Sequence, residues 1–172
     1  MNKAKRRFFA MAAGILIAPL IMVVAPGSAS AHGYINSPAS RQAQCAQNIV
    51  SCGEIKWEPQ SVEGPKGLRN CHANVARFAD LNDNNKPWRV SSVGRTVTFN
   101  WTFTARHRTA SYEYYVGNTR IAYFDGGNVQ PPATVQHTVN MGSFTGRQKV
   151  LAIWNIGDTP MAFYSCVDLQ VS

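Results

Sequence analysis

An apolar side chain stands at every second position of residues 97–103, with Thr or Asn between them. Successive side chains of a β-strand point to opposite faces, so this alternation predicts a strand with one buried face. The same period of two returns at residues 135–141. The chain from about Val93 onward is therefore expected to build β-sheets.

Further short strands are expected along this part of the chain, at residues 112–116, 120–124, 149–156 and 163–171. Gly117-Asn118 fits the turn of a hairpin, and the turn at residues 142–146 is rich in glycine. Several short strands with regular turn signals predict an all-β fold, an antiparallel β-sandwich of the immunoglobulin or fibronectin III type.

The front of the chain, from residue 32 to about residue 90, has a different composition. It is rich in Pro, Gly, Asn and Ser and shows no sustained periodicity. One short helix is expected from about Asn74 to Leu81, ended by the polar run at residues 82–85. A loop region of this length is uncommon without a function, because loops carry sites that a scaffold holds.

Residues 1–31 have the three parts of a secretory signal. A positive start and an apolar run at residues 8–25 precede the small residues Ala29-Ser30-Ala31. No positive charge follows the apolar run, which disfavours the alternative of an uncleaved anchor. We therefore expect removal of residues 1–31, secretion of a single domain spanning residues 32–172, and no membrane attachment after cleavage.

The charge of the expected mature chain is modest. Four of the 17 Lys and Arg lie in the signal, which leaves 13 against nine Asp and Glu, a net charge of about +4. The positive charges are scattered, whereas a nucleic-acid-binding protein is expected to carry a basic stripe. An uncharged polymer suits this composition at least as well.

The four cysteines, Cys45, Cys52, Cys71 and Cys166, all lie behind the signal. An even number in a secreted chain favours two disulfides over metal ligation. Three connectivities are possible, and loop-closure entropy does not choose among them.

Two histidines are candidates for metal ligands. Cleavage after Ala31 would leave His32 with a free amine and an imidazole on one residue. His107 follows the expected end of a strand, where sites are commonly displayed. The amine nitrogen and the ring nitrogen of His32, together with one imidazole from elsewhere in the chain, would give a three-nitrogen, T-shaped set suited to Cu(II). The alternative is that His32 is an accident of cleavage, frayed and unbound.

The other two histidines have plainer interpretations. His137 alternates with Val135 and Val139 and is expected to be a satisfied core or edge residue. His72 is expected to be solvated.

Four sequence blocks resemble one known family, and they lie in that family's order along the mature chain. They are His32-Gly33-Tyr34-Ile35 with Ser37-Pro38-Ala39-Ser40-Arg41, Trp57-Glu58-Pro59-Gln60-Ser61-Val62-Glu63-Gly64, Thr102-Phe103-Thr104-Ala105-Arg106-His107, and Asp158-Thr159-Pro160-Met161-Ala162-Phe163-Tyr164. Together they resemble the secreted, chitin-binding lytic polysaccharide monooxygenases of auxiliary activity family ten, in their compact single-domain branch.

The resemblance implies a copper site with one ion per chain. His32, by amine and ring, and His107 would form the histidine brace. Phe163 would take the position of the axial aromatic, and Ala105 would crowd the other axial side. Glu63 would steer oxygen species at the metal. The residues implied for the flat substrate surface are Trp57, Glu58, Pro59, Gln60, Thr104 and Asp158. The implied disulfides are Cys45–Cys52 and Cys71–Cys166.

The implied activity is oxidative cleavage of insoluble chitin at C1 by a monomer that uses an external reductant with O2 or H2O2. Two residues depart from many members, which have Tyr at Trp57 and Asn at Met161. Three alternatives stay open: a non-catalytic chitin-binding protein, a glycoside hydrolase using Glu58, Glu63 or Asp158, and activity on cellulose.

Overall fold

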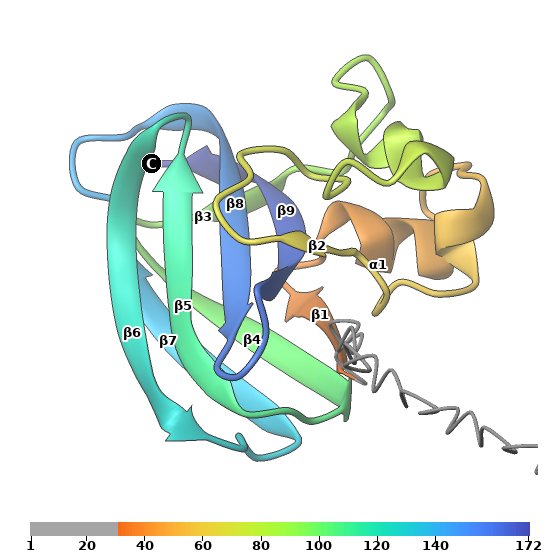
Figure 1. The fold of residues 1–172 in the computed structure, drawn as a ribbon. Coiled ribbons are helices and arrows are strands. Elements are labelled where there is room, and N and C mark those ends of the chain that lie inside the picture. The colour runs from red at the N-terminus through yellow and green to blue at the C-terminus, as the bar shows by residue number, and fades with distance from the viewer. Residues whose placement is uncertain (1–30) are drawn as a thin grey trace, which may run out of the picture.

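The computed structural model of the protein describes residues 31–172, and two packed β-sheets make up most of this part (Figure 1). The smaller sheet has the strand order β1-β4-β7, formed by β1 (His32–Ser37), β4 (Thr96–Ala105) and β7 (Thr134–Asn140). The larger sheet has the order β2-β9-β8-β5-β6, formed by β2 (Glu63–Pro65), β9 (Met161–Val171), β8 (Gly146–Ile156), β5 (Thr109–Val116) and β6 (Thr119–Val129). The predicted antiparallel sandwich is confirmed.

One short strand departs from the antiparallel pattern, because β3 (Ser91–Val93) runs parallel to β9. The predicted signal segment lies outside the described residues, apart from Ala31. No helix within residues 31–172 is long and apolar enough to cross a membrane.

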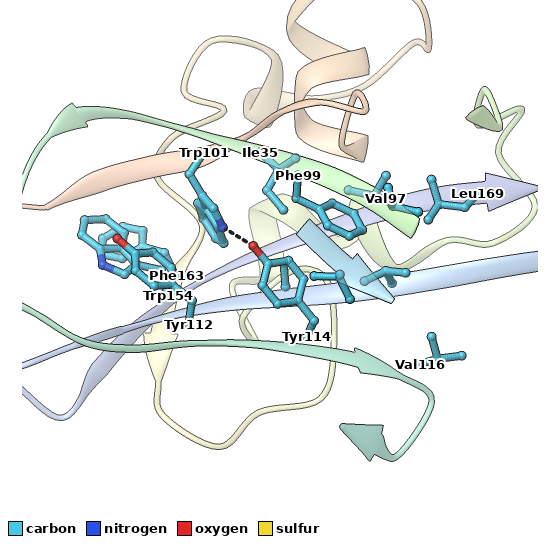
Figure 2. Close-up of a cluster of buried hydrophobic side chains, with 14 of the residues drawn as sticks. Ile35, Val97, Phe99, Trp101, Tyr112, Tyr114, Val116, Trp154, Phe163 and Leu169 are labelled. Atoms are coloured by element: carbon cyan, nitrogen blue, oxygen red, sulfur yellow. Dashed lines mark hydrogen bonds between the residues drawn. The ribbon is translucent and has the colours of Figure 1, made fainter. Parts of the chain in front are cut away.

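The core between the sheets consists largely of aromatic and aliphatic side chains, as Figure 2 shows. All four apolar residues of the alternating stretch in β4 are at most 5% exposed, which confirms the predicted face. Trp101 stacks on Phe103 with ring centroids 5.9 Å apart, and its Nε1 donates a hydrogen bond of 2.9 Å to the Tyr114 hydroxyl. The bond satisfies the indole of a fully buried side chain.

His137 on β7 is a core residue, as predicted. Its ring stacks on Phe124 with centroids 4.0 Å apart, and its Nδ1 lies 2.8 Å from the Tyr114 hydroxyl. Burial lowers the pKa of His137 to about 4 from the ordinary 6.5, because the charged ring would lose its hydration. His137 is therefore neutral in the native protein at neutral pH.

This burial predicts a loss of stability in acid. Between pH 6.5 and 4 the unfolded chain protonates His137 while the native state does not. Stability is therefore complete above pH 6.5 and falls as the pH drops toward 4, by up to about 3 kcal/mol. Urea denaturation of the wild type and His137→Gln across this window checks the prediction. The variant should show a shallower pH dependence, whatever its absolute stability, and equal slopes would contradict the prediction.

The loop region packs beside the sandwich and contains three short helices (Figure 1). These are α1 (Arg41–Ala46), η1 (Glu54–Lys56) and η2 (Ala76–Asn82), the last two of 3₁₀ type. A second apolar cluster joins this region to the outer face of the larger sheet through residues such as Phe78, Tyr115 and Tyr164.

The helix predicted from Asn74 begins later and is of a different type. Asn74 has a φ of 61°, in the left-handed region, and Phe78 interrupts the 3₁₀ segment with non-helical backbone angles. Helical spacing of apolar residues therefore indicated the right segment but the wrong backbone geometry.

Two disulfides hold the loop region. They join Cys45 to Cys52 and Cys71 to Cys166, with Cα atoms 5.5 Å apart in each pair. The second disulfide ties the loop region to β9 across a sequence separation of 95 residues. The pairing implied by the family resemblance is confirmed.

A buried ion pair makes a further link between the loop region and β9. Arg41 in α1 is 2% exposed, and its Nε donates to Asp168 Oδ2 at 2.7 Å. A second guanidinium nitrogen donates to Asp168 Oδ1 at 3.0 Å, and the third to the Leu81 carbonyl at 2.9 Å. The charge of Arg41 is thus compensated inside the protein.

Candidate metal centre and its surrounding surface

Strand pairing brings the two candidate histidines to the same end of the sandwich. β1 pairs with β4 so that His32 stands opposite Ala105, and His107 follows two residues later. Gly33 lies against Phe103, where an added Cβ would come within 2.5 Å of the ring carbon Cδ1. The amide of Gly33 also donates to the Gln60 carbonyl at 3.1 Å, which ties β1 to the Trp57–Gly64 block.

Phe163 lies beside His32 at this end of the sandwich. It is fully buried and packs against Trp154, with ring centroids 5.0 Å apart and the ring planes tilted by 33° (Figure 2). The Phe163 ring lies 6.4 Å from the ring of His32. The pairing of β2 with β9 places Glu63 opposite Phe163. Three of the implied site residues, from three different strands, are therefore neighbours.

Glu63 carries a carboxylate oxygen without a partner. Its Oε1 is buried and makes no hydrogen bond to the described residues. Burial raises the pKa of Glu63, and the nearby charge of His107 counters part of that rise. Because buried polar atoms are nearly always paired, this oxygen is free to bond a water molecule or another small group.

His107 is held by Asp158 from the loop between β8 and β9. The His107 Nε2 and the Asp158 Oδ1 are 2.8 Å apart. The hydrogen bond from His107 lowers the pKa of Asp158, which is exposed and stays ionised. A metal that uses Nε2 of His107 would require this contact to open, whereas Nδ1 makes no bond to the residues described.

The donor types in this region suit copper better than zinc. Within residues 31–172 no group of three or more His, Cys, Asp and Glu is arranged to hold a metal ion. All four cysteines are in disulfides, so a tetrahedral thiolate site is excluded here. Two imidazoles are available, and cleavage before His32 would add an amine as the third nitrogen. Such a nitrogen set fits Cu(II).

The residues implied for the substrate surface are all at least partly exposed. Trp57, at the end of η1, is 78% exposed, and the Nζ of Lys56 lies 4.7 Å from the centre of its ring. Thr104 and Asp158 are exposed and border His107 in sequence or by contact. The remaining implied substrate residues, Glu58, Pro59 and Gln60, are partly exposed.

The structure adds contacts that the sequence did not indicate. Arg77 on η2 pairs with both Glu54 and Glu58, although the sequence showed no pattern that links them. His72 is partly buried rather than solvated, and its Nδ1 has no partner among the described residues.

Comparison with known proteins gives a consistent result. Residues 32–169 match the family model described as lytic polysaccharide mono-oxygenase, cellulose-degrading. The chain is 57% identical to a lytic chitin monooxygenase of Streptomyces ambofaciens over 92% of both proteins. It is 34% identical to a lytic polysaccharide monooxygenase of Mycosarcoma maydis, of which it spans about half, 52%.

The fold has close counterparts among solved structures. A lytic polysaccharide monooxygenase of Jonesia denitrificans superposes with a TM-score of 0.79 and 43% identity, over 82% of this chain and 100% of that one. The family model matches 138 residues, a range that contains all four sequence blocks, and the β-sandwich superposes on a member of the same family. The chain belongs to the lytic polysaccharide monooxygenases of auxiliary activity family ten.

Proposed function

We propose that the protein is a secreted, monomeric, copper-dependent monooxygenase that cleaves chitin by oxidation at C1. Three observations support the proposal: His32 stands opposite Ala105, two residues before His107; the Phe163 ring lies 6.4 Å from the His32 ring; and Glu63, opposite Phe163, has a buried, unpaired Oε1. The family is copper-dependent in general. In this proposal residues 1–31 are removed and residues 32–172 are the catalytic domain. The family match, which begins at His32, supports that boundary.

His32, through its amine and ring, and His107 would hold the ion. Bound copper would supply a centre that accepts an electron from an external reductant and activates O2 or H2O2 to abstract a hydrogen from the sugar ring. The Phe163 side chain has no atom that could bind a metal, so it would keep its own side of the site apolar. Ala105 would limit the room on the other side.

Glu63 would handle a proton in this site. Burial raises its pKa, which favours the protonated carboxyl group, and the unpaired Oε1 can take part in a hydrogen bond. It sits within the electrostatic reach of His107 and on a strand anchored to β9. Glu63 is thus suited to position and protonate a small oxygen species without being a ligand.

The exposed surface would bind the polymer. One face of the Trp57 ring would stack on a pyranose ring, and the polar groups of Thr104 and Asp158 would bond to hydroxyl or N-acetyl groups. Oxygen insertion at C1 would lead to elimination across the glycosidic bond, leaving a lactone that hydrates to an aldonic acid. The relative named as a lytic chitin monooxygenase supports chitin over the cellulose of the family description.

The pKa directions of the carboxylates do not separate a hydrolase from a monooxygenase, so the reaction products have to. An acid and a base or nucleophile are needed, and the acid must hold its proton near neutral pH. Glu58 is paired with Arg77, and hydrogen bonding lowers the pKa of Asp158. Burial raises the pKa of Glu63.

The test uses the processed protein, copper, ascorbate and β-chitin, with amorphous cellulose in parallel. We expect oligosaccharides with aldonic acid ends from chitin by mass spectrometry, dependent on ascorbate and abolished by EDTA. Binding without oxidised products would favour a non-catalytic chitin-binding protein. Ordinary reducing ends formed without reductant would favour a hydrolase, and either result would overturn the proposal.

Glu63→Gln should separate catalysis from metal binding. The amide keeps the shape of the side chain but cannot carry the proton, so the rate of product formation should fall by about 100-fold. Copper affinity, measured by calorimetry, should stay near that of the wild type. Glu113→Gln, which changes a carboxylate on β5, is the matched control and should retain full activity. A parallel loss of copper affinity in Glu63→Gln would make Glu63 a ligand instead.

A further inference from the structure

The Arg77 side chain links η2 to the loop that carries Trp57. Its two terminal nitrogens contact both carboxylate oxygens of Glu58, NH1 with Oε1 and NH2 with Oε2, the latter at 3.3 Å. NH1 also lies 3.3 Å from Oε2 of Glu54. Paired contacts between guanidinium and carboxylate planes have a defined geometry, which a lysine would not reproduce.

Both partners of this pair are held in place by their surroundings. The guanidinium carbon of Arg77 lies 4.3 Å from the ring centre of Phe78, which is fully buried. On the other side, the Trp57 amide donates to the Glu54 carbonyl at 3.0 Å, and the Ser61 amide donates to the Glu58 carbonyl at 2.9 Å. The ion pair therefore stands on fixed backbone directly beside the exposed Trp57.

We propose that Arg77 sets substrate specificity by neutralising Glu58, so that the surface around Trp57 binds acetylated, uncharged chitin in preference to deacetylated, cationic chitin. This inference rests on the proposed function, because it concerns how that surface binds its polymer. Arg77 acts here through Glu58 and is a positioning residue.

Charge is the property that distinguishes the two polymers. An N-acetylglucosamine unit is neutral and offers an amide N–H, whereas a glucosamine unit carries an ammonium group in mild acid. A Glu58 carboxylate without Arg77 would attract that ammonium group across the few ångströms between the surface and the polymer, a distance shorter than the Debye length of about 8 Å at physiological salt. Paired with Arg77, the Glu58 carboxylate keeps lone pairs that can accept an amide N–H. Arg77, Glu54 and Glu58 together carry one net negative charge, against two if Arg77 is removed.

The charge of Lys56 acts in the same direction. Lys56 precedes Trp57 in the sequence, and its Nζ lies 4.7 Å from the centre of the Trp57 ring. An ammonium group of the polymer that approaches Trp57 would meet this cation as well. Lys56 thus opposes cationic sugars next to Trp57, while Arg77 weakens the attraction that Glu58 would exert on them.

The test measures binding, with no dependence on catalysis. Metal-free protein is mixed with chitin and with partly deacetylated chitin in mild acid, and the bound fraction gives the affinity ratio. We expect Arg77→Gln to bind the deacetylated polymer about three- to tenfold more tightly than the wild type does, with little change on chitin. The gain should vanish in about 1 M salt, where the Debye length is about 3 Å.

Three further variants make the result specific. Arg95→Gln also removes one positive charge, but at the start of β4, where Arg95 donates to the Gly142 carbonyl. This variant should leave the ratio of the two polymer affinities unchanged. Arg77→Lys keeps the positive charge and should keep most of the wild-type preference. Glu58→Gln combined with Arg77→Gln removes the carboxylate next to Trp57 and leaves only that of Glu54, so most of the gain should disappear.

Several outcomes would overturn the inference. An equal gain in Arg95→Gln would assign the effect to the net charge of the protein. A matched loss of affinity for both polymers in Arg77→Gln would assign Arg77 a purely structural role. If the wild type binds chitin and the ratio does not move, this inference fails alone. If the wild type binds neither polymer, the proposed function fails with it.

Discussion

The variant His107→Ala is expected to lose oxidative activity altogether and to bind Cu(II) more than about 100-fold more weakly than the wild type. The proposed set has three nitrogens, and the described residues hold no further His, Cys, Asp or Glu grouping that could replace the missing imidazole. Competition calorimetry of the processed protein measures the affinity, and mass spectrometry of chitin products measures the activity.

The control for this variant is His72→Ala, which also removes one imidazole, in the segment that follows Cys71. It should bind copper as the wild type does. A protein that keeps Ala31 should behave like His107→Ala, because the nitrogen of His32 is then an amide and not an amine. Wild-type copper affinity in either His107→Ala or the extended protein would refute the proposed ligand set.

Asp168→Asn should destabilise the fold by about 3–5 kcal/mol. Arg41 is 2% exposed and donates to both carboxylate oxygens of Asp168, so the amide would leave a buried guanidinium without its counter-charge. Urea denaturation gives the free energy of unfolding of each protein. The loss should be far larger than that of Arg77→Gln, since Arg77 belongs to an exposed ion pair.

The double variant Arg41→Met with Asp168→Leu tests the cause of that loss. Removing both charges also removes the desolvation cost, so the double variant should be much closer to the wild type than Asp168→Asn is. If Asp168→Asn proves as stable as the wild type, the buried charge is compensated by other groups, and the structural account of this pair is wrong.

The sequence predicted the strands of seven or more residues and missed the three shorter ones. β4 and β7 alternate over seven or more residues, long enough for the pattern to stand out. β2 and β3 have three residues each, and they form because β9 offers them hydrogen bonds. β1 contains one large aliphatic residue, Ile35, so its pairing with β4 left no periodic signal.

The candidate site divides in the same way. Its residues were predicted from four sequence blocks, and strand register joins these blocks in two pairs, through β1 with β4 and β2 with β9. The hydrogen bond between His107 and Asp158 and the ion pair between Arg77 and Glu58 were not predictable. Each joins side chains from separate segments, and their meeting depends on how the loops pack rather than on a local pattern.

The pairing of β1 with β4 has a consequence for the lifetime of the proposed enzyme outside the cell. Chain termini usually fray and are the first residues that exopeptidases reach. Here the first residue of the proposed mature chain stands in a strand ladder, and the Gly33 amide is bonded to Gln60. An aminopeptidase would have to peel β1 from β4 before cutting. The residue whose loss would inactivate the protein in one cut is therefore shielded by the fold itself.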